Sequence, residues 1–129
     1  TGIGGAAHGY LARLTHAGLA DLSWNPEANF NVSGMALGDD DSLFVVGQFS
    51  QIGGAARAGL ARLWRNDSGT ADPSWSPQPD VQPATVQVYP NLNRVVVGGF
   101  FTAIGGRSRV GLAVLPGSEE VLANSFELP

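Results

Sequence analysis

The chain has 129 residues, a formal net charge of −4 and no cysteine, and its seven basic residues are all arginine. This length fits one domain or part of a larger one, and an acidic, lysine-free composition argues against nucleic acid and anionic membranes as partners. The absence of cysteine excludes a disulfide framework and cysteine-type zinc sites. No run of 18 apolar residues is present, so we expect no membrane insertion.

One phrase occurs three times along the chain. It reads TGIGGAAHGYLARL from Thr1, FSQIGGAARAGLARL from Phe49 and FTAIGGRSRVGLAVL from Phe101. The Ile-Gly-Gly triplet begins at Ile3, Ile52 and Ile104, so successive repeats are 49 and 52 residues apart. Repeats of roughly 40–50 residues that each hold four short strands are typical of β-propeller blades. We therefore predict an all-β fold of four-stranded antiparallel blades.

The expected strands follow from the repeat in chain order. Residues 1–28 hold the phrase and then DLSW, which we interpret as the last two strands of a half blade. The next unit, residues 29–80, gives strands at Val32–Leu37, Ser42–Phe49, Gly59–Leu63 and Asp72–Trp75. The third unit, residues 81–129, gives the corresponding strands at Ala84–Tyr89, Arg94–Phe101, Gly111–Leu115 and Ala123–Phe126. The chain therefore supplies about two and a half blades.

The repeated glycine pair predicts a tight connection between the second and third strands. Its members are Gly4, Gly5, Gly53, Gly54, Gly105 and Gly106. Glycine is needed where φ is positive or where two backbones approach closely. The alternative, a phosphate-binding loop, needs a following helix and, in a P-loop, a lysine. The chain offers neither, so we favour the structural turn.

Other positions recur with a structural meaning. Trp24, Trp75 and Phe126 share one repeat position, which predicts aromatic core residues between blades. Arg57 and Arg109 recur together with Asp21 and Asp72. We interpret these as charge-assisted hydrogen bonds that hold a loop to the outer strand, and a ligand-binding arginine remains open.

Residues with catalytic or metal-binding chemistry are few. His8 and His16 are the only histidines, and neither has the partners of a metal site or a catalytic set. Asp39–Asp41 could ligate Ca²⁺, but their spacing lacks the glycine and distal glutamate of an EF-hand. We interpret them, and Glu119–Glu120, as solvated turns. We therefore expect no enzyme activity, no cofactor and no metal.

One aromatic residue stands at a position where the other repeats have no aromatic side chain. Trp64 has Thr15 and Pro116 as its equivalents, so the fold does not require an aromatic side chain there. Arg65 follows it, and tryptophan and arginine are both enriched at binding hot spots. Trp64 and Arg65 are therefore the best candidates for a contact surface, with a packing role as the alternative.

The phrase VGGFFTAIGGRSRVGLAVL, followed by LANSF, and the stretch LARLWRNDSGTADPSWSP resemble the delta-60 repeat family of bacterial β-propeller proteins. The resemblance covers essentially the whole chain. It departs from the family pattern at Gln48, at Val114 in place of the arginine of L-A-R-L, and at Ala123 in place of aspartate. His8 stands where the pattern has arginine. The resemblance implies a propeller in a large secreted or surface protein, with no known catalytic residues.

These observations lead to one functional expectation with an alternative. We expect a non-enzymatic propeller module that acts as a structural or protein-interaction scaffold at the cell surface or outside the cell. Its partners would be further copies of itself or the remainder of a parent polypeptide that completes the propeller, because open strand edges and apolar blade faces recruit partners. The alternative is a carbohydrate-binding propeller.

Overall fold

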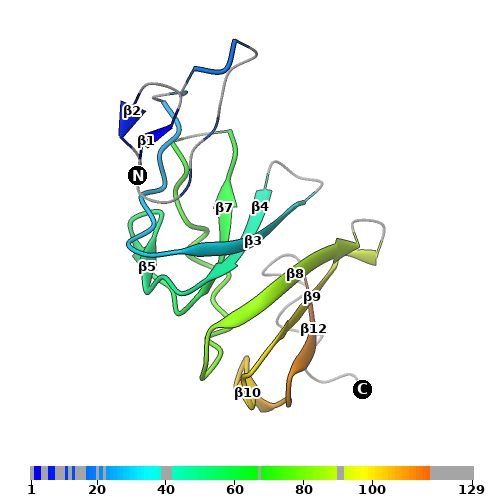
Figure 1. Ribbon diagram of the computed structural model, residues 1–129. Helices are drawn as coiled ribbons and strands as arrows, with labels where there is room; N and C mark the ends of the chain where they lie inside the picture. The colour runs from blue at the N-terminus through cyan, green and yellow to red at the C-terminus, as the bar shows by residue number, and fades with distance from the viewer. Residues whose placement is uncertain are drawn as a thin grey trace.

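The computed structural model describes residues 2–3, 6–7, 11, 13, 17–19, 21, 23–38, 42–66, 68–89 and 92–116 (Figure 1). Its strands are β1 (Gly2–Ile3), β2 (Ala6–Ala7), β3 (Val32–Leu37), β4 (Ser42–Gly47), β5 (Gln51–Ile52), β6 (Ala55–Ala56), β7 (Leu60–Trp64), β8 (Pro83–Tyr89), β9 (Arg94–Gly99), β10 (Ala103–Ile104), β11 (Arg107–Ser108) and β12 (Leu112–Pro116). Within these ranges the fold is all-β, and no helix is long and apolar enough to cross a membrane.

Two three-stranded antiparallel sheets form the body of the molecule. The central sheet has the order β3-β4-β7, and the C-terminal sheet has the equivalent order β8-β9-β12. Each sheet carries a two-stranded hairpin between its second and third strands, β5-β6 and β10-β11 respectively. Figure 1 shows the central sheet between the N-terminal segment and the C-terminal sheet, with β3 and β8 side by side.

The sheets are held together by two apolar clusters, one on each face of the central sheet. Cluster 1 consists of Leu11, Trp24, Ala28, Leu43, Val45, Phe49, Ile52, Ala61, Leu63 and Ala71. Cluster 2 lies between the two sheets and consists of Phe44, Val46, Leu60, Trp75, Val95, Val97, Phe101, Ile104, Ala113 and Leu115. Because β4 contributes alternate side chains to both clusters, every residue of that strand is buried.

Each sheet has three strands within the described residues, and the expected fourth strand of the C-terminal sheet, Ala123–Phe126, lies outside them. In the central sheet the fourth strand is reduced to a single bridge between Leu63 and Ala71. Asp72 still donates its N–H to the Arg62 carbonyl. Ser74, whose N–H would be the next to face β7, donates it to the Asp72 carboxylate instead, and Trp75 donates its N–H to the Asp72 carbonyl, so the chain turns and the ladder ends there.

The expected correspondence of the inner strands is also wrong, by one residue. In the structure Met35 lies opposite Val45, and Val86 lies opposite Val97. Val45 and Val97 are equivalent, so Met35 corresponds to Val86 rather than to Gln87. A slip of one residue moves a whole strand to the other face of its sheet. Both inner strands are short and mixed in polarity, so the sequence alone did not determine how they align.

The Gly-Gly pair forms the tip of the small hairpin in each described repeat. Gly53 and Gly54 join β5 to β6 with φ of +62° and +78°, and Gly105 and Gly106 have +63° and +76°. Two successive positive φ values are the requirement of a type I′ hairpin turn. The structure therefore confirms that these glycines occupy conformations unfavourable for other residues, and it places them within the connection from second to third strand.

The hairpin tip also fits closely against the rest of the chain. Gly53 donates its N–H to the Pro26 carbonyl at 2.6 Å and accepts from the Ala71 N–H at 3.0 Å. Gly105 repeats the first contact with the Pro77 carbonyl. The first glycine of the pair therefore serves two purposes, a left-handed backbone and a close approach.

Gly53→Ala is expected to lower the free energy of unfolding by more than Gly54→Ala does. Both substitutions put a side chain at positive φ, which costs roughly 1–2 kcal/mol. A Cβ at position 53 would also collide with the backbone of Ala71, whereas a Cβ at position 54 would meet nothing within 4 Å. Urea denaturation of the two variants measures the difference, and equal losses would contradict the close-approach explanation.

Candidate functional site

The most buried charges of the described chain belong to an ion pair in the central sheet. Arg62 on β7 donates to a carboxylate oxygen of Asp72, and both side chains are almost fully buried. Ser74 donates its N–H and its hydroxyl to the other carboxylate oxygen, at 3.0 and 2.7 Å. The guanidinium group lies 4.4 Å from the ring centroid of Trp64 and 5.8 Å from that of Phe44. The Asp72 carboxylate therefore has the hydrogen bonds that a buried charge requires, and aromatic rings pack against its arginine partner.

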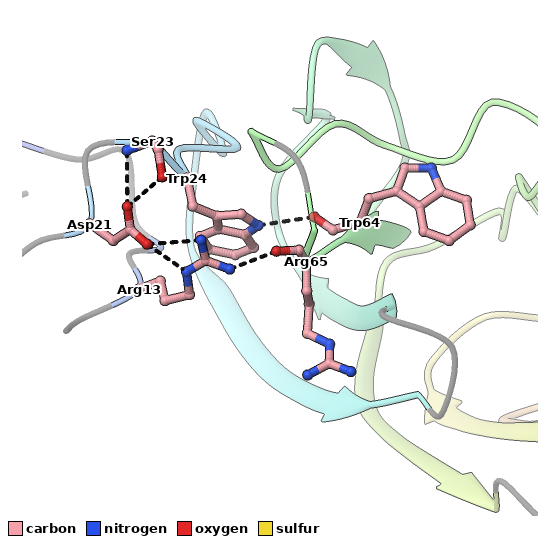
Figure 2. Close-up of polar contacts among 6 residues, drawn as sticks. All are labelled: Arg13, Asp21, Ser23, Trp24, Trp64 and Arg65. Atoms are coloured by element: carbon pink, nitrogen blue, oxygen red, sulfur yellow. Dashed lines mark hydrogen bonds and ion pairs between the residues drawn. The ribbon is translucent and has the colours of Figure 1, made fainter. Parts of the chain in front are cut away.

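The same arrangement occurs one repeat earlier, in a more exposed form. Arg13 donates to Asp21 at 2.8 and 3.1 Å, and Ser23 donates its N–H and hydroxyl to the same side chain (Figure 2). The hydrogen bond from the Ser23 hydroxyl, followed by that from Arg13, lowers the pKa of Asp21 below its ordinary value. Arg13 also lies 5.4 Å from the Trp24 ring centroid. The pair is therefore a feature of the repeat.

These pairs correct the partner expected for the aspartates. Arg57 does hold the loop to the outer segment, but it donates to the main-chain oxygen of Asp72, at 2.9 Å, and not to the carboxylate. Arg109 donates to the main-chain oxygen of its neighbour Ser108. The carboxylates are taken instead by the arginines of L-A-R-L. A signal in the sequence could have shown this, because Val114 and Ala123 replace arginine and aspartate together in the third repeat.

The repeated tryptophans are buried, as expected for core residues between sheets. Trp24 packs in cluster 1 and donates its indole N–H to the Trp64 carbonyl at 2.9 Å. Trp75 packs in cluster 2 and donates in the same way to the Pro116 carbonyl at 2.8 Å. Each tryptophan thus reaches from the end of one repeat into the sheet of the next. Phe126 lies outside the described residues.

Trp64 and Arg65, the expected contact surface, have a structural role through their backbone. Their carbonyls accept hydrogen bonds from Trp24 and from Arg13, while both side chains point away from these donors (Figure 2). Because a carbonyl accepts the bond, proline can replace tryptophan at the equivalent position 116. The Trp64 ring is partly buried beneath Arg62. Its side chain therefore has a packing contact, as the alternative interpretation expected.

These contacts describe one unit that recurs along an all-β chain. Residues 39–74 match a β-propeller family model. The model's description is "Domain of unknown function (DUF5122) beta-propeller", and the matched residues run from the β3-β4 turn to the segment that follows β7. The match supports the β-propeller repeat expected from the sequence, and the narrower delta-60 assignment stays a resemblance. No curated protein and no solved structure matches the chain.

A polar clamp that the sequence analysis missed ties each Trp-x-Pro segment to the following hairpin. Asp80 accepts the N–H groups of Thr102 and Ala103 at 2.8 and 3.1 Å, and it accepts the Thr102 hydroxyl at 2.5 Å. These hydrogen bonds, that of the hydroxyl first, lower the pKa of Asp80 from 3.8 to about 2. Asn29 binds the backbone of Ser50 and Gln51 in the same way. The signal was available in the sequence, since Asn and Asp stand at equivalent positions.

The described residues contain no group of three or more His, Cys, Asp or Glu side chains that could hold a metal ion. Several candidates lie outside the described residues, namely Gly4, Gly5, His8, His16, Asp39–Asp41 and Glu119–Glu120. Two hollows remain. A polar cavity of about 460 Å³ lies beside the β5-β6 tip, bounded by Asn25, Glu27, Gln51 and Thr70 among others. An apolar cavity of about 400 Å³ lies beside Trp24 and β3.

The buried and exposed ion pairs are expected to differ sharply in a double-mutant cycle. Asp72→Ala alone leaves the Arg62 guanidinium buried without its partner, which costs roughly 3–5 kcal/mol. The double variant Arg62→Val with Asp72→Ala reproduces the Val114 and Ala123 pairing and should cost less than the sum of the single changes.

The matched control is the same cycle at Arg13 and Asp21. For that partly exposed pair we expect a coupling below about 1 kcal/mol. Guanidinium denaturation measures the parent chain and the six variants. Additive losses at Arg62 and Asp72 would contradict a paired, buried charge.

Asp80→Asn is expected to make the chain less sensitive to acid. The folded pKa of Asp80, about 2, lies below its ordinary value of 3.8, so the carboxylate stabilises the fold above pH 3.8. That stability is lost as pH falls toward the folded pKa. Asparagine keeps the hydrogen bonds, as Asn29 does, but does not titrate.

Unfolding free energies measured from about pH 5 to pH 2 should therefore fall less steeply in Asp80→Asn than in the parent chain. The reciprocal variant Asn29→Asp should gain acid dependence. Parallel profiles for Asp80→Asn and the parent would contradict the clamp.

Proposed function

We propose that the chain is a non-enzymatic propeller module that works through protein contacts. The outer face of the C-terminal sheet supports this proposal. Leu112 and Val114 on β12 are 60% and 57% exposed. Their equivalents on β7, Leu60 and Arg62, are buried, with the C-terminal sheet packed on that face of the central sheet. An exposed face with the chemistry of an interior face is typical of an interaction surface.

Two further residues extend this apolar surface beyond what the repeat requires. Phe100 is 85% exposed and Val110 is 78% exposed. The central sheet has Gln48 and Ala58 at the equivalent positions, so the fold does not need an apolar side chain there. Large exposed aromatic and aliphatic side chains that packing does not require favour a binding role.

The partner we propose is another sheet of the same repeat type. In the chain itself, the corresponding face of the central sheet is covered by Val95 and Val97 of β9 together with Trp75. The partner would be a further copy of the chain or the remainder of a parent polypeptide. The family resemblance favours a surface or secreted location for such an assembly.

A carbohydrate-binding role is the second candidate, and the polar cavity beside the β5-β6 tip favours it. Glu27, Gln51 and Thr70 border this cavity and offer a carboxylate, an amide and a hydroxyl. These groups suit the hydroxyls of a sugar. Binding on a glycan array that Gln51→Ala abolishes would support this role, and binding that survives the substitution would count against this cavity.

Val114→Glu is expected to weaken self-association of the chain. A carboxylate at that position would have to be desolvated in an apolar contact, which is strongly unfavourable. Sedimentation velocity of the isolated chain at micromolar concentration measures the association. Ser108→Glu on the exposed strand β11 is the matched control and should leave the association unchanged. A compact monomer for the parent chain would contradict self-association through this face.

A further inference from the structure

The opposite side of the molecule carries a second apolar surface, beside Trp24 and β3. Met35 and Leu37 are 55% and 61% exposed there. In the sheet they lie opposite Val45 and Leu43, which belong to cluster 1. They therefore point to the same side of the central sheet as a buried core. Together with Leu11, Arg13 and Trp24 they border the apolar cavity of about 400 Å³.

The C-terminal sheet shows how the same surface looks when it is covered. Val86 and Val88 are the equivalents of Met35 and Leu37, since they lie opposite Val97 and Val95. Both are partly buried and pack against cluster 2. The element that covers them is the β3-β4 hairpin, which contacts β8. Phe44 and Val46 are the side chains of β4 that belong to cluster 2.

Leu11 and Arg13 indicate which residues a hairpin covering this surface would contact beside Met35. Leu11 and Arg13 correspond to Leu60 and Arg62, which pair with Val46 and Phe44 of β4. Arg62 is buried with the Phe44 ring 5.8 Å away, whereas Arg13 is partly exposed.

We infer that this surface, formed by the exposed Met35 and Leu37 beside the cavity that Leu11, Arg13 and Trp24 line, docks a β-hairpin with the chemistry of β3-β4. The hairpin's aromatic residue lies beneath Arg13, and its next inward residue covers Met35. The inference rests on the proposed function, because it treats the chain as a module that works through contacts.

A second copy of the chain is not the occupant we propose. Its two candidate hairpins, β3-β4 and β8-β9, are already paired with β7 and β12 of their own sheets. Donating either would leave that copy's third strand unpaired and open cluster 2. The occupant is therefore a hairpin of this repeat type that is not already part of a complete sheet.

The single methionine of the chain provides the test, because Met35 lies in the surface itself. The probe is a fusion in which a second copy of residues 29–49 precedes Thr1, with Met35→Leu in the added copy. Thr1 corresponds to Ser50, so the added strand continues into the chain as β4 does. Oxidation of Met35 by hydrogen peroxide, followed by mass spectrometry, reports the exposure of the surface.

Met35 should oxidise several-fold more slowly in the fusion than in the parent chain. Two matched controls should oxidise as fast as the parent: a fusion whose added copy carries Phe44→Glu, and one with a Gly-Ser segment of equal length. Nuclear Overhauser contacts between the Met35 methyl group and the added Phe44 ring give a second readout. Unchanged oxidation in a fusion that is folded by circular dichroism would overturn the inference.

The same measurement in a Val114→Glu background separates this inference from the proposed function. Protection of Met35 there supports the hairpin site even if Val114→Glu leaves association unchanged and the proposed contact fails. If Val114→Glu abolishes association and the fusion does not protect Met35, the proposed contact is supported and the hairpin site is contradicted. Protection that rises with the concentration of the unfused chain would mean that a second copy occupies the surface, which also overturns it.

Discussion

The rest of the structure depends on the contacts of the segment that connects one sheet to the next. Asp72 belongs to the sheet behind it through its pair with Arg62, and Trp75 inserts between that sheet and the next. The Trp75 indole then donates to Pro116 on the far sheet. A stretch of four residues is thus held by two sheets at once. Because neither sheet buries its apolar face alone, packing through this segment contributes to the stability of both sheets.

The glycine turn also depends on the connecting segments. The hairpin tip at Gly53 binds the Pro26 carbonyl from the segment of the previous repeat and the Ala71 N–H from its own. A side chain at Gly53 would separate these backbones, and a residue other than glycine would oppose the positive φ. The phrase that recurs along the sequence is therefore the part of the repeat that touches both connecting segments. This gives the repeated glycines a structural explanation without a ligand.

The sequence was sufficient for features that every repeat shares and insufficient for those that depend on pairing. Trp24, Trp75 and the glycines recur at equivalent positions of the repeat, and their burial and backbone conformation follow from it. The partner of Asp72 did not follow, because Arg57 and Arg62 both lie near it in the chain and only burial separates them. The residue-by-residue alignment of β3 with β8 did not follow either, because an alignment shifted by one residue is equally compatible with the sequence. The fourth strand of the central sheet was overestimated because the chain turns at Ser74, whose N–H binds the Asp72 carboxylate and not β7.

The third repeat shows how one repeat type can form both an interior and an outer face. Arg62 is tolerated inside the molecule only because Asp72, Ser74 and two aromatic rings surround it. At the equivalent site of the C-terminal sheet an arginine would need the same partners. Val114 and Ala123 remove the charge and its partner together. An apolar pair avoids the desolvation cost that a buried ion pair carries. The two departures from the repeat pattern therefore suit the dry contact with another sheet that we propose.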